Sequence, residues 1–437
     1  MPAALAAYLN HPLERTGYSV GFFAIRLSLP CRPPLTRGVI MHEVLSNTCK
    51  GSMRKADMAN QPEMIVVGAG VMGCGTAYWL SKAGYKVLVL EQEAIACGAS
   101  GVAAAMLEAV GHGAQLAVND PLTAFARAGF ELHQELQPVL LEESGVDIGY
   151  RENPVIHPAF TTAEAEILQA YALERRHDVP AVQWLEGQAL WDVEPHVNRA
   201  VLGALVTHQA QVLAYRFVLA LARAAEQRGM ELRHGEVIGL ERQAGGVIGV
   251  RLRNGETLTT STVVLALGPW SQHAAAWLDL RIPIYPVRGQ LLELRVPEPQ
   301  LRATISYGGM YLVHKADGLT LAGTTEEHDS GFINQPTAAG RQAILEAALK
   351  MAPTLAEAEV VGQVCGLRPC SADHLPLMGA VPGWPGVYMV AGHFRSGMLL
   401  STISTRCIAD LIMTGKSPVS LAAFDPARFT PLLHASL

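Results

Sequence analysis

Cysteine is scarce in this chain of 437 residues, and the seven that occur have no paired spacing and form no Cys-x-x-Cys pair. This pattern excludes a disulfide framework and a zinc site of that kind, so we expect reduced thiols and a cytoplasmic protein. The fifteen histidines are dispersed without ligand spacing, and we expect no metal. No nucleophile elbow indicates serine-hydrolase chemistry.

Excess positive charge and long apolar runs are also missing. The formal net charge is −6, with no basic stripe interleaved with aromatic residues, so we expect no nucleic-acid partner. Three runs without acidic or basic residues, at 64–81, 257–278 and 374–394, approach the roughly 20 residues that a membrane helix needs. Glycines interrupt the first run and prolines the other two, so we expect buried elements and no transmembrane span.

The first 60 residues differ in composition from the rest. They contain few acidic residues, and three prolines within 30–34 break any helix. Arg26 interrupts the apolar patch 17–29, and no basic segment precedes it, so a secretory signal is not expected. We expect 1–60 to be a dispensable extension, disordered or upstream of the native start, with a weak targeting segment as the alternative.

A glycine-rich loop marks the start of the periodic pattern. Residues 64–67 read as a buried strand, 71–83 as a helix and 86–90 as a second strand, which together predict a βαβ unit. In the loop between strand and helix, Gly68 permits the turn, Gly70 lets a pyrophosphate approach, and Gly73 lets helix and strand pack closely. Glu91, eighteen residues after Gly73, can accept hydrogen bonds from a ribose. These features predict a dinucleotide site without saying which dinucleotide binds.

The remaining pattern predicts an α/β fold in which a second, sheet-containing domain is inserted into the dinucleotide domain. Strand-like segments lie between 231 and 267, with the hairpin turn Asn254-Gly255, and again within 283–330. Helical patterns cover 162–176, 214–229, 338–351 and 397–413. We expect a Rossmann-like parallel sheet from 61–115, 206–282 and 352–425, and an antiparallel-sheet substrate domain from 116–205 and 283–351.

Two further stretches extend the site. Small residues at 99–107 can lie against a flat ring or a phosphate, or simply pack a helix on the sheet. A second glycine-containing loop, 392–399, opens a helix whose backbone amides can face an electron-rich group.

From Met64 to the end, about 370 residues, the chain resembles the D-amino-acid oxidase superfamily. It is most similar to the glycine oxidase branch associated with thiamine biosynthesis, and also to the flavoprotein subunits of bacterial hydrogen cyanide synthase. The motifs that carry the resemblance are the glycine loop, the small-residue stretch through Met106 and Leu107, 266–271, 286–290, 366–369, Asp373 with Pro376 and Gly379, and 392–399.

The resemblance implies FAD as the cofactor, held non-covalently. Gln92 departs from the basic residue common at its position, and tethering of the flavin through Cys97 or Cys365 is not expected. The residues expected to bind FAD are Gly68, Gly70, Val71, Met72, Gly73, Glu91, Gln92, Ala99, Ser100, Ala104, Ala105, Met106, Val237, His393, Phe394, Ser396, Gly397, Met398 and Leu399.

The resemblance also assigns the substrate carboxylate to Arg368, with Arg395 near the same group and Tyr311 as a hydrogen-bonding partner. The planar guanidinium of arginine matches a carboxylate in bidentate fashion and keeps its charge. The chain departs from the branch at 209–214, where an Asp-Gly-x-Val-x-Pro segment is often found. It also departs at Glu326, where some relatives have an apolar residue near the substrate; this carboxylate can restrict the substrate side chain, attract an amine or pair with a neighbouring base.

The expected reaction is oxidative deamination of glycine, a small D-amino acid or a secondary amine. Hydride transfer to flavin N5 would give an imine, then a 2-oxo acid and ammonia, with dioxygen reduced to peroxide. The alternative is the flavoprotein subunit of a hetero-oligomeric dehydrogenase that passes electrons to a partner. A non-catalytic FAD-binding module and a nicotinamide dehydrogenase fit less well, since they leave the arginines or the second loop without a role. We expect a homo-oligomer.

Overall fold

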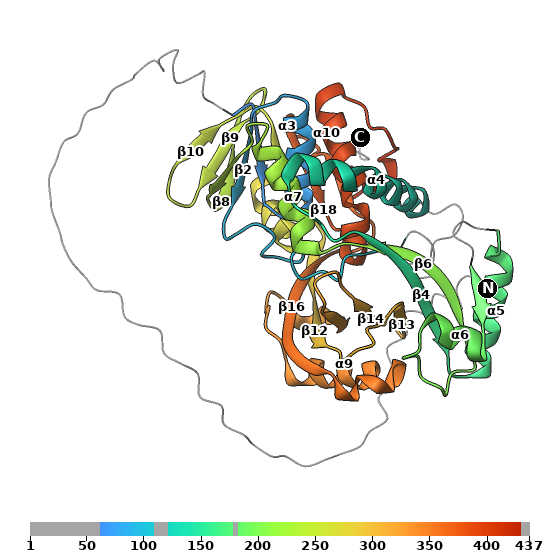
Figure 1. Ribbon diagram of the computed structural model, residues 1–437. Coiled ribbons are helices and arrows are strands. Elements are labelled where there is room, and N and C mark those ends of the chain that lie inside the picture. The colour runs from blue at the N-terminus through green and yellow to red at the C-terminus, as the bar shows by residue number, and fades with distance from the viewer. Residues whose placement is uncertain (1–61, 109–120, 178–181, 430–437) are drawn as a thin grey trace, which may run out of the picture. The chain divides into compact units, whose positions relative to one another are not determined.

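The computed structural model describes residues 62–108, 121–177 and 182–429 (Figure 1). The expected extension 1–60 lies outside these residues. The described chain contains two principal sheets, one parallel and one largely antiparallel, with a cavity between them.

The parallel sheet has six strands in the order β17-β18-β11-β1-β2-β7, and only β17 runs antiparallel to its neighbour. Helix α3 (Val71–Lys82) joins β1 to β2, which confirms the predicted βαβ unit. Every residue of β1 is buried, as expected for a strand covered on both faces. The strands are β1 (Met64–Val67), β2 (Val87–Glu91), β7 (Glu231–His234), β11 (Val263–Leu265), β17 (Leu377–Ala380) and β18 (Val387–Ala391).

Alternate residues of this sheet pack into two hydrophobic clusters. Val66 and Val89 lie in one cluster with residues of α3 and of helices α4 (Pro121–Ser144), α7 (Ala214–Glu226) and α10 (Gly397–Thr414). Ile65 and Leu90 lie in the other. There they meet the three-stranded antiparallel sheet of β8 (Val237–Gln243), β9 (Gly246–Leu252) and β10 (Thr257–Thr259). Figure 1 shows the resulting layers, with helices on one side of the parallel sheet and the small sheet on the other.

The second sheet has nine strands, with the path β16-β12-β15-β14-β13-β4-β6-β3 and β5 beside β6. Its neighbours are antiparallel, as expected, except for the parallel pair β13 and β4. Figure 1 shows β16 and the pair β4 and β6 as curved ribbons on either side of β12 and β14. The strands are β3 (Met106–Leu107), β4 (Arg151–Ala159), β5 (Gln183–Leu185), β6 (Gly203–Gln211), β12 (Ile284–Arg295), β13 (Thr304–Tyr307), β14 (Met310–His314), β15 (Thr320–Gly323) and β16 (Glu359–Ser371).

Helix α9 (Ala338–Met351) packs on this sheet, burying Ile344 and Met351 in one cluster with Leu292 of β12 and Leu312 of β14. Thr337 caps the start of α9 by accepting a hydrogen bond from the Gly340 N–H. The other helices are α5 (Thr162–Arg175), α6 (Gly187–Val193) and α8 (Ala275–Leu278), with the short 3-10 helices η1 (Gly268–Ala274), η2 (His328–Ser330), η3 (Pro353–Glu357), η4 (Phe394–Ser396), η5 (Ala422–Phe424) and η6 (Pro426–Phe429).

Strand membership differs from the expected domain segments at three places. Strands β3, β6 and β16 belong to the nine-stranded sheet, whereas 61–115, 206–282 and 352–425 were expected to form the dinucleotide domain. Their partners lie more than 40 residues away along the chain, so local periodicity does not indicate which sheet they join. We propose that 203–211 and 359–371 belong to the substrate domain; the other domain boundaries stay predictions.

Candidate active site

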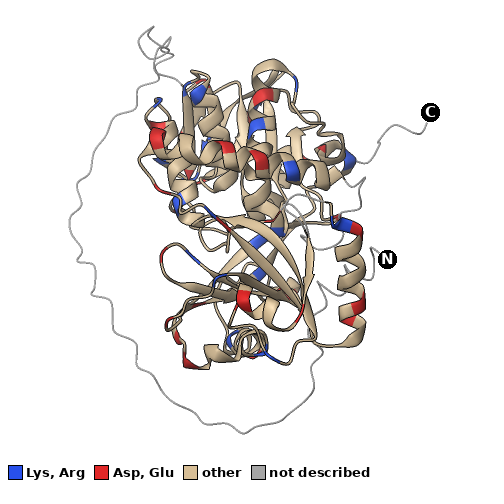
Figure 2. Cartoon of the chain, turned by 45° about the vertical axis from the view of Figure 1, so that its right-hand side comes forward, with Lys and Arg blue, Asp and Glu red and all other residues tan. Residues whose placement is uncertain are grey.

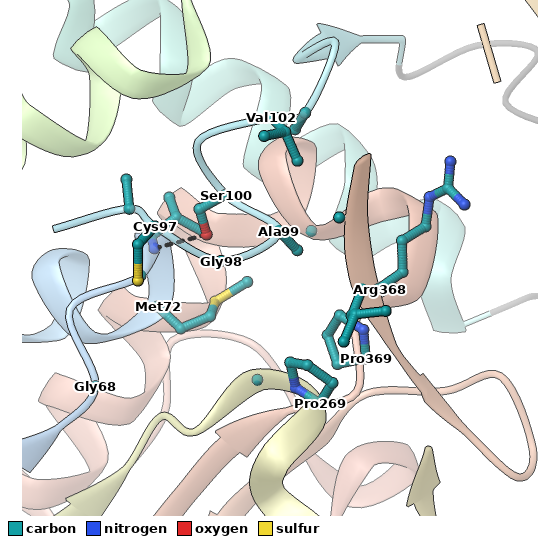
Figure 3. A pocket seen from close by; sticks show the side chains of 18 of the residues that line it. Gly68, Met72, Cys97, Gly98, Ala99, Ser100, Val102, Pro269, Arg368 and Pro369 are labelled. Carbon is teal, nitrogen blue, oxygen red and sulfur yellow. Dashed lines mark hydrogen bonds between the residues drawn. The ribbon is translucent and has the colours of Figure 1, made fainter. Parts of the chain in front are cut away.

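One cavity of about 460 Å³ lies where the carboxyl ends of β1, β2, β11 and β18 face the nine-stranded sheet. This edge of a parallel sheet is where ligands of such folds bind. Strands β3, β12, β14 and β16 supply the opposite wall. All residues expected to bind cofactor or substrate lie in its wall except Gly73, Ser396 and Leu399. Figure 3 shows the glycine loop and Arg368 around the same space.

The glycine loop has the close contacts that require its glycines. Gly68 has φ of +105°, and a Cβ there would lie 2.5 Å from the Ala266 carbonyl oxygen. A Cβ on Gly73 would lie 1.8 Å from the Gly68 carbonyl oxygen, so Gly73 packs the helix against the loop instead of lining the cavity. Ser100 accepts a hydrogen bond of 3.0 Å from the Val71 N–H, which ties the small-residue stretch to the first turn of α3 (Figure 3).

Glu91 ends β2 with its carboxylate at the cavity. Its two oxygens accept hydrogen bonds from the N–H groups of Ala69, at 2.8 Å, and Glu93, at 2.9 Å. The carboxylate therefore holds the glycine loop in place and has further lone pairs for a ribose hydroxyl. Cys97 lies beside this carboxylate, with its sulfur 4.0 Å from Oε1. Gln92 and Val237 line the same end of the cavity.

A buried lysine, which sequence reasoning missed, supports the small-residue stretch. Lys315 Nζ donates to the carbonyl oxygens of Ala104, at 2.8 Å, and Val212, at 2.7 Å. Burial lowers the pKa of Lys315 to about 7. Ala105, which follows Ala104, has φ of +51°, a conformation that non-glycine residues seldom adopt. No sequence signal separates Lys315 from an ordinary lysine after a strand.

The loop 392–399 turns tightly into α10. Gly392 and Phe394 have φ of +80° and +48°, and α10 begins at Gly397. His393 is buried, and its Nε2 lies 2.9 Å from the Ser404 hydroxyl. Burial lowers the pKa of His393 to about 3, so this imidazole is neutral. Ser396 precedes α10 as its N-cap, and Leu399 is buried in the core.

Arg368 projects from β16 into the cavity wall. Its guanidinium donates to the Thr325 carbonyl oxygen at 3.1 Å and to the Thr324 hydroxyl at 2.7 Å. Burial, and next the positive charge of Arg395, lower its pKa from the usual arginine value. No carboxylate of the described residues lies within ion-pair distance of it. Gly289 of β12 makes room for this guanidinium, because a Cβ there would lie 2.3 Å from it.

Tyr311 is almost fully buried on β14 and lines the same part of the cavity. Burial raises the pKa of its hydroxyl, while the nearby positive charges of Arg368 and Arg395 lower it. The Thr324 side chain also lowers this pKa. A neutral hydroxyl and two guanidinium groups therefore face one region of the cavity.

Arg395 already has partners within the protein. Its Nη1 lies 3.2 Å from Oε2 of Glu326, and its Nη2 donates to the Gly309 carbonyl oxygen at 3.3 Å. Glu326 also lies 3.0 Å from Nε2 of His328. Of the three roles expected for Glu326, pairing with a neighbouring base is the one that these contacts show.

Several further wall residues were not assigned a role from the sequence. Thr324 bonds Arg368, Gly289 gives it space, and Phe332 stacks on Trp270 with ring centroids 6.2 Å apart. Gly289 and Trp270 occur in motifs that carry the family resemblance, so the sequence contained a signal for them. Thr324 and Phe332 lie outside those motifs, so no motif indicates that they line the cavity.

Charges are mixed over the described chain, as Figure 2 shows, with acidic and basic residues side by side on the helices. In the ranges that the structure describes, no helix is both long and apolar enough to cross a membrane. The same ranges contain no group of three or more His, Cys, Asp or Glu arranged to hold a metal ion.

A family model, a curated relative and a solved structure each match most of this chain. The family model for FAD dependent oxidoreductases (DAO) matches residues 63–411. Glycine oxidase of Geobacillus kaustophilus (strain HTA426) is 32% identical over 376 residues, which are 85% of this chain and 98% of that protein. The crystal structure of glycine oxidase from Geobacillus kaustophilus has a TM-score of 0.78 and 31% identity, covering 84% of this chain and 99% of that one.

A second kind of relative is the hydrogen cyanide synthase subunit HcnC of Pseudomonas aeruginosa (strain PAO1). It is 28% identical over 404 residues, covering 84% of this chain and 96% of that protein. The family match extends over both sheets and the cavity between them. The chain therefore belongs to the DAO family of FAD-dependent oxidoreductases.

Proposed function

We propose that this protein oxidises a small amino acid or secondary amine, with glycine as the first candidate, and that dioxygen is the electron acceptor. The observation that carries the proposal is Arg368, a largely buried guanidinium in the cavity wall with no carboxylate partner among the described residues. A buried cation without a counter-ion is costly, so a bound anion stabilises it. We propose that this anion is the carboxylate of an amino acid, and the glycine oxidases among the relatives support that choice.

The cavity residues fit FAD, the cofactor of the family. The wall combines amides at the start of α3, the Glu91 carboxylate and the small side chains of Ala104 and Ala105 in one cavity. When bound there, FAD would supply the acceptor for the hydride and the route for the electrons to dioxygen. We propose that it is held non-covalently, since Cys97 lies at the Glu91 end of the cavity and away from Arg368.

In this proposal the residues of the chain mainly orient the substrate. Arg368 and the Tyr311 hydroxyl hold the carboxylate, which fixes the direction of the α-carbon hydrogen. The surrounding strands of the nine-stranded sheet exclude water from that end of the cavity. We assign no general base, because an amine that binds neutral needs none. The imine product then hydrolyses to a 2-oxo acid and ammonia, or to a 2-oxo acid and a primary amine when the substrate is a secondary amine.

The test is a panel of glycine, sarcosine, D-alanine and D-proline offered to the purified holoprotein, with peroxide as the readout. We expect peroxide with at least one of them, and the order of kcat/KM identifies the substrate class. In Arg368→Ala the loss of the buried ion pair should lower kcat/KM by about 30-fold or more while FAD stays bound. Equal kinetics in wild type and Arg368→Ala would remove Arg368 from the site.

The second candidate is a flavoprotein subunit that passes electrons to a partner protein. The similarity to HcnC, a subunit of a larger enzyme by its name, favours it. The same panel distinguishes the two, because a subunit of this kind would reduce an artificial dye with the amine and yield little peroxide.

A further inference from the structure

The two arginines of the cavity wall differ in their electrostatic state. Arg368 bonds only neutral acceptors, the Thr324 hydroxyl and the Thr325 carbonyl. Arg395 is paired with Glu326 at 3.2 Å. The cavity therefore presents one guanidinium with no carboxylate of the described residues at ion-pair distance, and one whose charge is offset directly by a carboxylate of the chain itself.

We propose that Glu326 determines specificity by occupying Arg395, so that the site accepts amines with a single carboxylate and discriminates against dicarboxylic ones. The inference rests on the proposed function, because it takes Arg368 as the anchor for the substrate carboxylate. Glu326 acts through Arg395 and is a positioning residue, since it is not itself in the cavity wall.

A second substrate carboxylate would meet two obstacles. It would have to displace Glu326 from Arg395, and it would then lie near the displaced carboxylate. Juxtaposed like charges weaken binding strongly when they are shielded from water. The Arg395 and Glu326 side chains are 29% and 36% exposed, so solvent screens this repulsion in part.

The neighbouring charges do not take over the role of Glu326. Glu327 is committed to Arg288 and also accepts from Gln290 at 2.6 Å. His328 lies on the other side of Glu326, with its Nε2 3.0 Å from Oε1, and holds this carboxylate in place. Removing the charge of Glu326 therefore frees Arg395 to bind an anion in the cavity.

The test compares sarcosine with iminodiacetate, which differs from it by a carboxylate on the N-methyl carbon. We expect Glu326→Gln to raise the ratio of kcat/KM for iminodiacetate to that for sarcosine by about tenfold or more. The change should come from KM for iminodiacetate, whereas kcat for sarcosine stays close to wild type. Glu326→Asp, which keeps the charge, should restore most of the discrimination. Glu359→Gln is the matched control, because Glu359 pairs with Arg295 at the far end of β12 and β16.

A binding measurement separates this inference from the proposed function. Acetate and malonate, with one and two carboxylates, are titrated into the holoprotein while the absorbance of its flavin is followed. Glu326→Gln should tighten malonate relative to acetate by about tenfold or more. Equal preference in wild type and Glu326→Gln would overturn the inference, as would an equal loss of activity on both amines in Glu326→Gln. If no amine is oxidised but malonate tightens as expected, the proposed function fails and the role of Glu326 stands.

Discussion

Replacing Gly289 by alanine tests how strand β12 positions the substrate-binding arginine. A Cβ at this position would lie 2.3 Å from Cζ, Nη1 and Nη2 of Arg368. Since non-bonded contacts need about 3.5 Å, the guanidinium must move by roughly 1 Å or swing away. A misplacement of about 1 Å can lower turnover about 100-fold. We therefore expect Gly289→Ala to lower kcat/KM of the best amine substrate by about two orders of magnitude.

This loss should occur without loss of fold or cofactor. Gly289 has no left-handed φ, so its backbone accepts alanine. Gly245→Ala is the matched control, because a Cβ there meets nothing within 4 Å and φ is again ordinary. Melting temperature and FAD content measured for both variants should be close to those of wild type.

A double-mutant cycle shows whether the added methyl lowers kcat/KM by displacing the Arg368 guanidinium or by obstructing the cavity. If the added methyl acts through the guanidinium, Gly289→Ala should cost nothing further in an Arg368→Ala background. Fully additive losses would mean that the methyl obstructs the cavity directly, since Gly289 also lines it. Unchanged kinetics in the single Gly289→Ala variant would refute the placement of Arg368 across Gly289.

The remaining predictions concern cofactor, substrate and pH. Glu91→Gln should raise the Kd of FAD by about tenfold, measured by fluorescence titration of the apoprotein, because the ribose loses a charged acceptor. Tyr311→Phe should lower kcat/KM by about tenfold with no change in bound FAD, and equal rates would show that its hydroxyl does not touch the carboxylate. Lys315 has a pKa of about 7 when folded and about 10.4 when unfolded, so the unfolded chain binds the extra proton between these values. Stability should therefore rise with pH from about 7 to 10, and Lys315→Met should flatten this slope in urea titrations at several pH values.

Local structure around the first sheet could be predicted well from the sequence. The bounds of β1 match the expectation, and those of α3 and β2 match within about one residue, because the period of apolar residues changes there from strand to helix and back. Gly73 is required by a contact within the loop itself, with the Gly68 carbonyl oxygen. Gly68, in contrast, lies against the Ala266 carbonyl oxygen, so this part of its role depends on a distant segment.

Pairings between distant segments could not be predicted in this way. Glu326 and Arg395 are 69 residues apart, and no local pattern indicates that one offsets the charge of the other. The contact between Gly289 and Arg368 likewise depends on the register of β12 with β16, which pairs Val287 with Arg368. Lys315 is similar, since its partners Ala104 and Val212 come from two other parts of the chain.

The nine-stranded sheet contributes strands from both ends of its path, β3 and β16, to one cavity. Backbone hydrogen bonds hold neighbouring strands about 4.8 Å apart, so the width of this wall is set by strand pairing and is hard to change by exchanging loops. Evolution or engineering of a new substrate range would therefore proceed through the side chains of this sheet that line the cavity. Trimming Leu291, which lies in that wall, is the direct way to admit bulkier amines within an unaltered scaffold.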